Sequence, residues 1–192
     1  MKTQKQRMST KTLVLGALLT ALVIILQFMG AFIKLGPFSI SLVLVPIVIG
    51  AATCGVAMGA WLGLVFGIVV LISGDAGAFL AVNVPGTLIT VILKGVACGY
   101  FAGLTYRLLK KVNRYLAVAT AAIVCPVVNT GIFLLGCLTF FMPIVTQWAG
   151  GENVAKYMIV GLVGFNFLFE LGTNIILSPV IVRLLNIRKL QK

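Results

Sequence analysis

Residues 40–73 read ISLVLVPIVIGAATCGVAMGAWLGLVFGIVVLIS, an apolar run without a charged side chain. A single α-helix over this run would measure about 51 Å at 1.5 Å per residue, whereas the hydrocarbon core of a bilayer is about 30 Å thick. The run must therefore turn once. Gly50, Thr53 and Gly55 supply the expected turn between two short membrane-spanning helices.

Four further apolar runs are each long enough to cross a bilayer as one helix. Hydrophobic residues make up 61% of the 192 residues and charged residues only 9%, and a soluble domain does not need so many apolar side chains. We therefore predict an all-α membrane protein with six transmembrane helices, in which residues 1–192 form a single integral membrane domain. The expected helices are 12–33, 40–54, 56–73, 85–106, 115–142 and 157–184.

Basic residues outnumber acidic residues by 15 to 3, which gives a net charge of +12. Most of the basic residues form three clusters beside apolar runs: Lys2, Lys5, Arg7 and Lys11; Arg107, Lys110, Lys111 and Arg114; and Arg183, Arg188, Lys189 and Lys192. Six helices place all three clusters on one side of the membrane, as the positive-inside rule requires of cytoplasmic segments. We therefore expect both termini in the cytoplasm, loops 34–39, 74–84 and 143–156 outside, and no nucleic acid partner.

Apart from Arg183 near the end of the last expected helix, two charged residues fall inside the expected helices. Lys94 lies about 14 Å and Glu170 about 20 Å from the outer end of its helix at 1.5 Å per residue. Because charges in hydrocarbon are costly, such residues are candidates for a functional site. Lys94 and Glu170 could form an ion pair that holds two helices together, or one or both could face a ligand cavity that opens outward.

Amide side chains accompany these two residues. Positions i, i+4, i+7 and i+8 of the last helix form one polar face that we expect to point inward; they are Asn166, Glu170, Thr173 and Asn174. In the fifth helix, Asn129 and Thr130 follow Pro126, which is expected to kink the helix. Single membrane asparagines often only join helices by hydrogen bonds, but several at one depth indicate a binding cavity.

Glycine recurs at every fourth position in two of the expected helices. The series are Gly55, Gly59, Gly63 and Gly67, and Gly95, Gly99 and Gly103. Small residues at this spacing let helix backbones approach closely. Two interpretations follow: close packing inside the protein, or a smooth outer surface that slides against a partner.

Catalytic and metal-binding patterns are missing from the sequence. The chain has no histidine and no phosphate-binding GxxxxGK[ST] loop, and its four cysteines have no CxxC spacing. These cysteines, Cys54, Cys98, Cys125 and Cys137, lie in or beside apolar runs. We therefore expect no enzyme activity, no cofactor and no metal site, and any energy from ATP would have to come through another chain.

Several motifs resemble the substrate-binding S components of prokaryotic energy-coupling factor (ECF) vitamin transporters. Ala17-Leu-Leu-Thr-Ala21 resembles the small-xxx-small motif by which these proteins dock on a shared transmembrane coupling subunit. Three further motifs resemble the riboflavin, folate and pantothenate branch: Asn83-Val-Pro85-Gly86-Thr87, Lys94-Gly95, and Val128-Asn129-Thr130-Gly131. The resemblance covers the whole chain, and no motif identifies the vitamin.

The resemblance implies a multi-pass protein of the cell membrane that binds a vitamin between the outer halves of the fourth to sixth helices. It implies release after the protein topples in the bilayer, docked to the coupling subunit and two cytoplasmic ATPases. Lys94 would pair with an anionic group of the ligand, and Trp148 or Phe38 would cover it. The other expected ligand contacts are Asn83, Asn129, Asn166, Glu170 and Asn174.

Pantothenate is the first candidate ligand, because a deep lysine suits its carboxylate. Riboflavin is the second, because Phe79, Phe133 and Trp148 could stack on its ring system. Two other functions compete with this one. The chain could be a self-sufficient, proton-coupled secondary transporter that uses Glu170 as its proton site, or a membrane assembly protein.

Overall fold

The computed structural model describes the backbone of residues 10–32, 34–35, 38–39 and 42–190, and the side chains of residues 10–31 and 42–183. The elements in chain order are α1 (Thr10–Phe32), β1 (Lys34–Leu35), β2 (Phe38–Ser39), α2 (Leu44–Cys54), α3 (Val56–Ile72), α4 (Gly77–Leu80), α5 (Val84–Leu109), α6 (Arg114–Phe140), α7 (Met142–Ala149), α8 (Val154–Lys156), the π-helix η1 (Tyr157–Gly164) and α9 (Phe165–Leu190). A helical membrane fold was predicted, and the described chain is helical except for the short antiparallel hairpin of β1 and β2.

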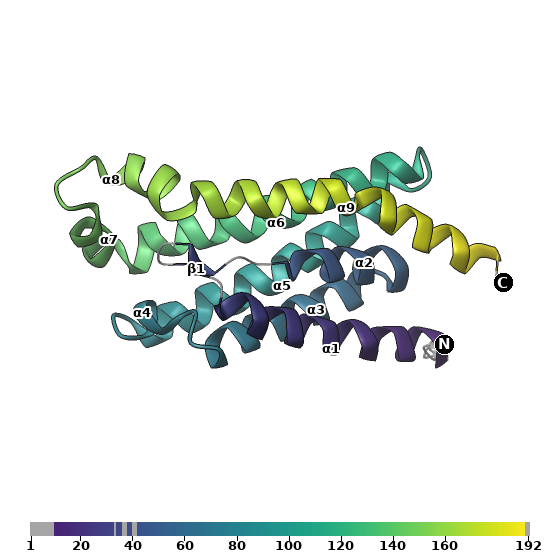
Figure 1. Cartoon of the computed structure of the whole chain (residues 1–192), viewed down its shortest axis with the longest axis horizontal. Helices are drawn as coiled ribbons and strands as arrows, with labels where there is room; N and C mark the ends of the chain where they lie inside the picture. Colours follow the sequence, from purple (N-terminus) through teal and green to yellow (C-terminus); the bar gives the residue numbers. More distant parts are fainter. Residues whose placement is uncertain (1–9, 33, 36–37, 40–41, 191–192) are drawn as a thin grey trace, which may run out of the picture.

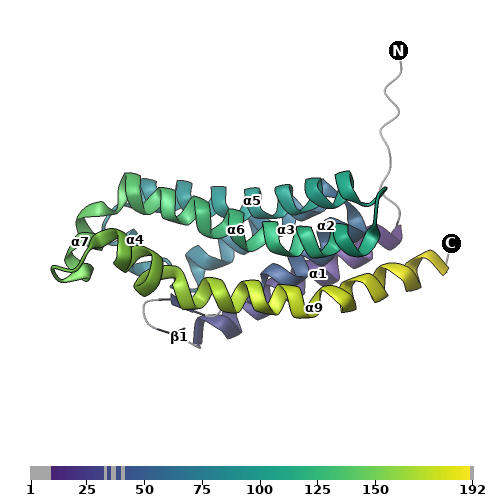
Figure 2. The ribbon, with the colours of Figure 1, turned by 90° about the horizontal axis from the view of Figure 1, so that it is seen from above.

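The long helices run side by side along one axis (Figure 1). The start of α1, the turn between α5 and α6 and the end of α9 lie at one end, whereas α4 and α7 lie at the other (Figures 1 and 2). The members of the three basic clusters whose backbone is described lie at or beside the first of these ends: Lys11 at the start of α1, Arg107, Lys110, Lys111 and Arg114 around the turn between α5 and α6, and Arg183, Arg188 and Lys189 in the last part of α9. This arrangement agrees with the expected sidedness, and the orientation in the membrane stays a prediction.

Four helical segments are long and apolar enough to cross a membrane: Thr10–Ala31, Val84–Leu109, Arg114–Phe140 and Val154–Arg183. The remaining apolar helices are shorter, because α2 has 11 residues and α3 has 17. At 1.5 Å per residue they measure about 16 Å and 26 Å, so α2 alone does not cross a core of about 30 Å. The count of six spanning helices therefore stays a prediction.

The expected turn between α2 and α3 is present at Gly55. Its φ of 101° is a backbone conformation that glycine adopts without strain. The α2 helix begins at Leu44 rather than at residue 40, close before Pro46, which suits the first turn of a helix. Its side chains are largely buried, and it touches α1, α3, α5, α6 and α9, so this short helix lies at the centre of the bundle.

The two glycine series pack against each other. A β-carbon on Gly63 would clash with the carbonyl oxygen of Gly95, and one on Gly59 would clash with that of Gly99. The main chains of α3 and α5 are therefore in direct contact, as in other membrane helix pairs with small residues at this spacing. Of the two interpretations, internal packing is confirmed. The sliding surface is wrong, because these glycines are buried, and Gly55 belongs to the turn.

The helix that carries Asn166 and Glu170 begins irregularly. Residues Tyr157–Gly164 form the π-helix η1, which continues directly into α9. π-Helical segments are rare and often occur at functional sites. Here η1 shifts the helical register just before the polar residues of α9.

Candidate functional site

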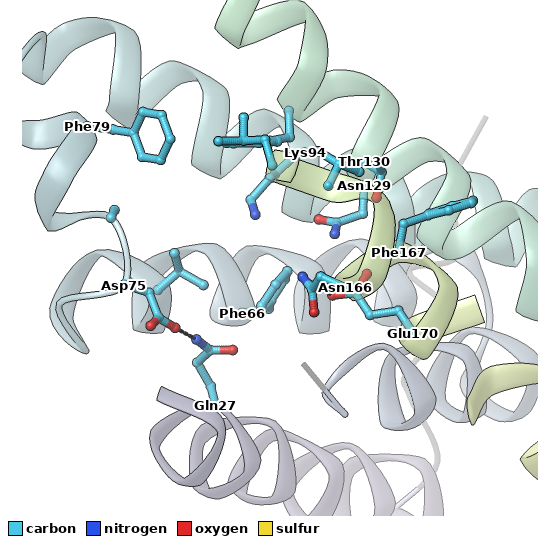
Figure 3. A pocket seen from close by; sticks show the side chains of 15 residues that line it. Gln27, Phe66, Asp75, Phe79, Lys94, Asn129, Thr130, Asn166, Phe167 and Glu170 are labelled. Carbon is cyan, nitrogen blue, oxygen red and sulfur yellow. Dashed lines mark hydrogen bonds between the residues drawn. The ribbon is translucent and has the colours of Figure 1, made fainter. Parts of the chain in front are cut away.

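One pocket collects polar side chains from four helices, α1, α5, α6 and α9, and from the turn after α3 (Figure 3). It lies toward the end of the bundle that carries α4. The lining residues are Gln27 from α1; Phe66 and Val70 from α3; Asp75, Ala76 and Phe79 from the α3–α4 turn and α4; Lys94 from α5; Asn129, Thr130 and Phe133 from α6; Leu162 and Val163 from η1; and Asn166, Phe167 and Glu170 from α9.

The pocket is narrow in this conformation. The centre of a water molecule can move through about 80 Å³ of it, which is enough for several waters, since one needs about 10–15 Å³ on this measure. Small-molecule pockets usually measure about 300–1,000 Å³, so an organic ligand of ordinary size would require the lining side chains or helices to move apart.

Lys94 points into the pocket and lies among aromatic rings. Its Nζ atom is 5.4 Å from the ring centroid of Phe66 and 5.5 Å from that of Phe133, which is the range of cation–π contact. Within the described part of the chain, no ion pair of 4.0 Å or less joins Lys94 to Glu170. The expected alternative of a mutual ion pair is therefore not present, and both residues face the same cavity.

Glu170 is held by an amide rather than by a cation. Its side chain is only 2% exposed, and its Oε1 accepts a long hydrogen bond of 3.5 Å from Nδ2 of Asn166. Asn129 of α6 lines the same part of the pocket. Figure 3 shows the three side chains converging from α6 and α9 at one end of the pocket.

Asp75 and Gln27 form the other polar end of the pocket. Gln27 is 2% exposed, and its Nε2 donates a hydrogen bond to Oδ2 of Asp75 (Figure 3). This bond joins α1 to the turn after α3. Lys94 lies between the two carboxylate ends, so a ligand in the pocket would meet acidic groups on both sides of one basic group.

An aromatic cluster closes the pocket toward α4 and α7. The ring of Phe79 meets those of Phe133, Phe141 and Trp148 edge to face, with centroid distances of 5.5, 4.9 and 5.5 Å. Phe79 is carried by the four-residue helix α4, and Trp148 by α7. Trp148 contacts Phe79 but does not itself line the cavity, so the expected cover of the ligand by Trp148 stays a prediction.

Known proteins identify the family of this chain. A family model described as "ECF transporter, substrate-specific component" matches residues 11–182. The chain belongs to this family. A solved structure of ThiT from Listeria monocytogenes is similar, with a TM-score of 0.68 and 20% sequence identity over 90% of this chain and 94% of that one. At this identity the likeness shows a shared fold. No curated protein sequence matches the chain.

In this S component the structure gathers four of the expected site residues and separates the others. Lys94, Asn129, Asn166 and Glu170 line one pocket. Asn83 instead caps α5, where its Oδ1 accepts from the backbone N–H of Gly86 at 2.9 Å.

Two further expected residues also lie away from the cavity or outside the described side chains. The Nδ2 of Asn174 donates to the backbone carbonyl of Glu170 at 2.8 Å, and Asn174 does not line the pocket. The side chain of Phe38 lies outside the described residues.

Several pocket residues of this S component were not expected from the sequence, among them Gln27, Phe66, Asp75 and Phe167. The sequence does mark Gln27 as a candidate, because it is the only amide side chain in the apolar run 12–33 and polar groups in hydrocarbon are costly. It does not mark Phe66 or Phe167, because a phenylalanine that faces lipid looks the same in sequence as one that faces a cavity.

The metal-binding potential of the described residues is low. They contain no group of three or more His, Cys, Asp or Glu side chains that could hold a metal ion. The groups that converge in the pocket are amides, carboxylates, one ammonium and phenyl rings, which recognise an organic ligand by hydrogen bonds, charge and stacking.

The expected docking motif of α1 lies on the outside of the bundle. Ala17 and Ala21 are exposed, and they line an apolar groove between α1 and α3. The indole of Trp61 forms part of its wall and donates a hydrogen bond to Oγ1 of Thr20 at 3.3 Å. Small residues along such a groove leave room for a helix of another protein.

Proposed function

We propose that this S component captures a small water-soluble vitamin from outside the cell and delivers it to a transmembrane coupling subunit and two ATPases. The observation that carries the proposal is the pocket: Lys94, Asn129, Asn166 and Glu170 converge in a cavity inside apolar helices. Ionisable side chains in such positions are costly unless they serve a ligand or a transport path. The family membership supplies the class of transporter.

The orientation follows from the ends of the bundle. The basic clusters would lie at the cytoplasmic surface, where they favour anionic lipid. The pocket, whose wall includes Asp75 and Phe79, would then open on the outer side beneath α4. The protein would be a multi-pass protein of a prokaryotic cell membrane with both termini inside.

Two vitamins, pantothenate and riboflavin, are candidate ligands of the pocket. Pantothenate would place its carboxylate at Lys94, whose ammonium has ring partners but no carboxylate within ion-pair distance among the described residues. Riboflavin would place its ring system against Phe79 and Phe133. Neither the family match nor the fold favours one of them.

The groove that contains Ala17 and Ala21 is proposed as the surface for the coupling subunit. It lies on α1 and α3, away from the aromatic cluster around Phe79. Binding and docking would therefore use separate faces of the protein, which lets a substitution in the groove block transport without blocking capture.

Purification with and without the coupling module tests the function. The S component should co-purify with a coupling subunit and ATPases, and the isolated protein should retain a vitamin that mass spectrometry identifies. Uptake by the protein alone in liposomes, driven by a proton gradient, would instead support the secondary transporter with Glu170 as its proton site.

A further inference from the structure

Two buried oxygens in the pocket have no hydrogen-bond donor. They are Oδ1 of Asn129 and Oδ1 of Asn166, which come from facing helices α6 and α9. Asn129 is only 6% exposed. A buried acceptor that lacks a donor loses its hydration without compensation. A ligand that has hydrogen-bond donors can therefore satisfy these two oxygens.

The carboxylate of Glu170 fixes which way the amide of Asn166 points. An ionised carboxylate only accepts hydrogen bonds, so the NH₂ group of Asn166 must face it, as it does at 3.5 Å. A flipped amide would set its oxygen against the carboxylate and repel it. The oxygen of Asn166 is thus turned away from Glu170, and Asn129, Asn166 and Glu170 line the same pocket with the oxygens of both amides lacking a donor.

Lys94 does not supply the missing donors. Its ammonium lies over the rings of Phe66 and Phe133, and neither amide oxygen has it as a partner. The pocket also contains two acidic side chains, Asp75 and Glu170, against this one basic side chain. The two amide oxygens without a donor and the excess of acidic over basic side chains therefore both favour a ligand with positively charged N–H donors.

We propose that the ligand of this site carries a protonated nitrogen group, an ammonium or an amino-substituted nitrogen heterocycle, which binds Asn129, Asn166 and Glu170 together. An ammonium has three N–H donors, one for each of these side chains. The rest of the ligand lies toward Lys94 and the phenyl rings. This inference rests on the proposed function, in which the pocket binds a vitamin, and it replaces the candidates pantothenate and riboflavin by a vitamin with a cationic donor group.

Binding by the purified protein in lipid nanodiscs tests the inference. The probes are two cationic vitamins: pyridoxamine, which carries an ammonium group, and thiamine, whose aminopyrimidine supplies the N–H donors while its charge lies on the thiazolium ring. Pyridoxine is the matched analogue that has a hydroxyl in place of the pyridoxamine amine, and pantothenate and riboflavin are the probes without a cationic group. We expect at least one cationic probe to bind about tenfold to a hundredfold more tightly than pantothenate and riboflavin, as a charged hydrogen bond in a buried site implies. Pyridoxamine should bind more tightly than pyridoxine.

Charge neutralisation at one position supplies the second readout. Glu170→Gln keeps the size of the side chain and should weaken the bound cationic probe by about tenfold to a hundredfold. Glu152→Gln is the matched control, because Glu152 is exposed outside the pocket, and it should change nothing.

The outcomes separate this inference from the proposed function. Tighter binding of pantothenate or riboflavin, unchanged affinity of the cationic probe in Glu170→Gln, or no binding of either cationic probe would each overturn the cationic ligand. Pantothenate or riboflavin binding would leave the vitamin-binding function intact. The proposed function itself fails if the protein neither retains a vitamin nor co-purifies with a coupling module.

Discussion

Replacing Gly63 by alanine tests the backbone contact between α3 and α5. The added β-carbon would lie 2.7 Å from the carbonyl carbon of Gly95 and closer still to its oxygen. The obstructing atoms belong to a helix backbone, which cannot rotate away as a side chain can. The two helices must therefore separate, and the neighbouring contacts at Gly59 and Gly67 loosen with them.

The magnitude follows from two opposing effects. Overpacking a close contact costs about 1–3 kcal/mol, and we take the upper half of this range because the clash is with main-chain atoms. Alanine in place of glycine inside a helix gains about 1 kcal/mol. The net free energy of unfolding of Gly63→Ala should therefore fall by about 1–2 kcal/mol.

Two other glycines make the measurement a graded series. A β-carbon on Gly67 would lie 3.0 Å from the carbonyl oxygen of Val91, so Gly67→Ala should be close to neutral. A β-carbon on Gly172 would meet nothing within 4 Å, so Gly172→Ala should match or exceed the wild type. Thermal unfolding in detergent, followed by helical circular dichroism, measures all three.

The melting temperature of Gly63→Ala should drop by about 2–8 °C, at about 2–4 °C per kcal/mol for a chain of this size. The reasoning is refuted if Gly63→Ala melts with or above the wild type, or if Gly172→Ala is the least stable of the three. The first result would mean that the α3 and α5 backbones are not in contact at Gly63, and the second would mean that the space around a glycine does not set the cost of its replacement.

Three further predictions concern topology, docking and the ligand. In a cysteine-free background, Glu152→Cys should react with an impermeant thiol reagent in intact cells and Val112→Cys should not; labelling of Val112→Cys would contradict the six-helix topology. Ala17→Trp should abolish transport but leave vitamin binding intact. Leu18 is exposed and lies outside the groove, so Leu18→Trp should allow both transport and binding. Loss of binding in Ala17→Trp would mean that this face of α1 packs inside the protein. Lys94→Met should weaken a vitamin that has an anionic group at Lys94 by about a hundredfold or more, because the anionic group would be left buried and unpaired at a cost of about 3–5 kcal/mol. Equal affinity in a binding titration would show that Lys94 does not pair with the vitamin.

The helices could be predicted closely from sequence because their signals are local. An apolar run longer than the bilayer is thick must turn, and Gly55 is the turn. The four expected pocket residues that do line the cavity were detectable for a related reason. Lys94, Asn129, Asn166 and Glu170 are costly in hydrocarbon wherever they point, so their presence alone indicates an inward face.

The relation between these residues could not be predicted, because it depends on how each helix is rotated about its axis. Lys94 and Glu170 looked equally suited to an ion pair and to a cavity. The direction in which Glu170 points depends on η1, because the wider turns of this π-helix set the rotation of α9. The contact between Lys94 and Phe66 could not be predicted either, because α3 is apolar on all sides and its sequence does not show which face points to the cavity.

The α3–α5 contact also affects how the binding site can change. Burying a long side chain in a helix interface restricts its rotamers at a cost of up to about 2 kcal/mol, whereas glycine has no side chain to restrict. At Gly59 and Gly63, main-chain atoms therefore set the distance between the two helices. Lys94 precedes Gly95 in the chain and is carried at a depth that does not depend on the rotamers of its neighbours. The other pocket side chains can then be exchanged to suit a different vitamin without displacing the lysine.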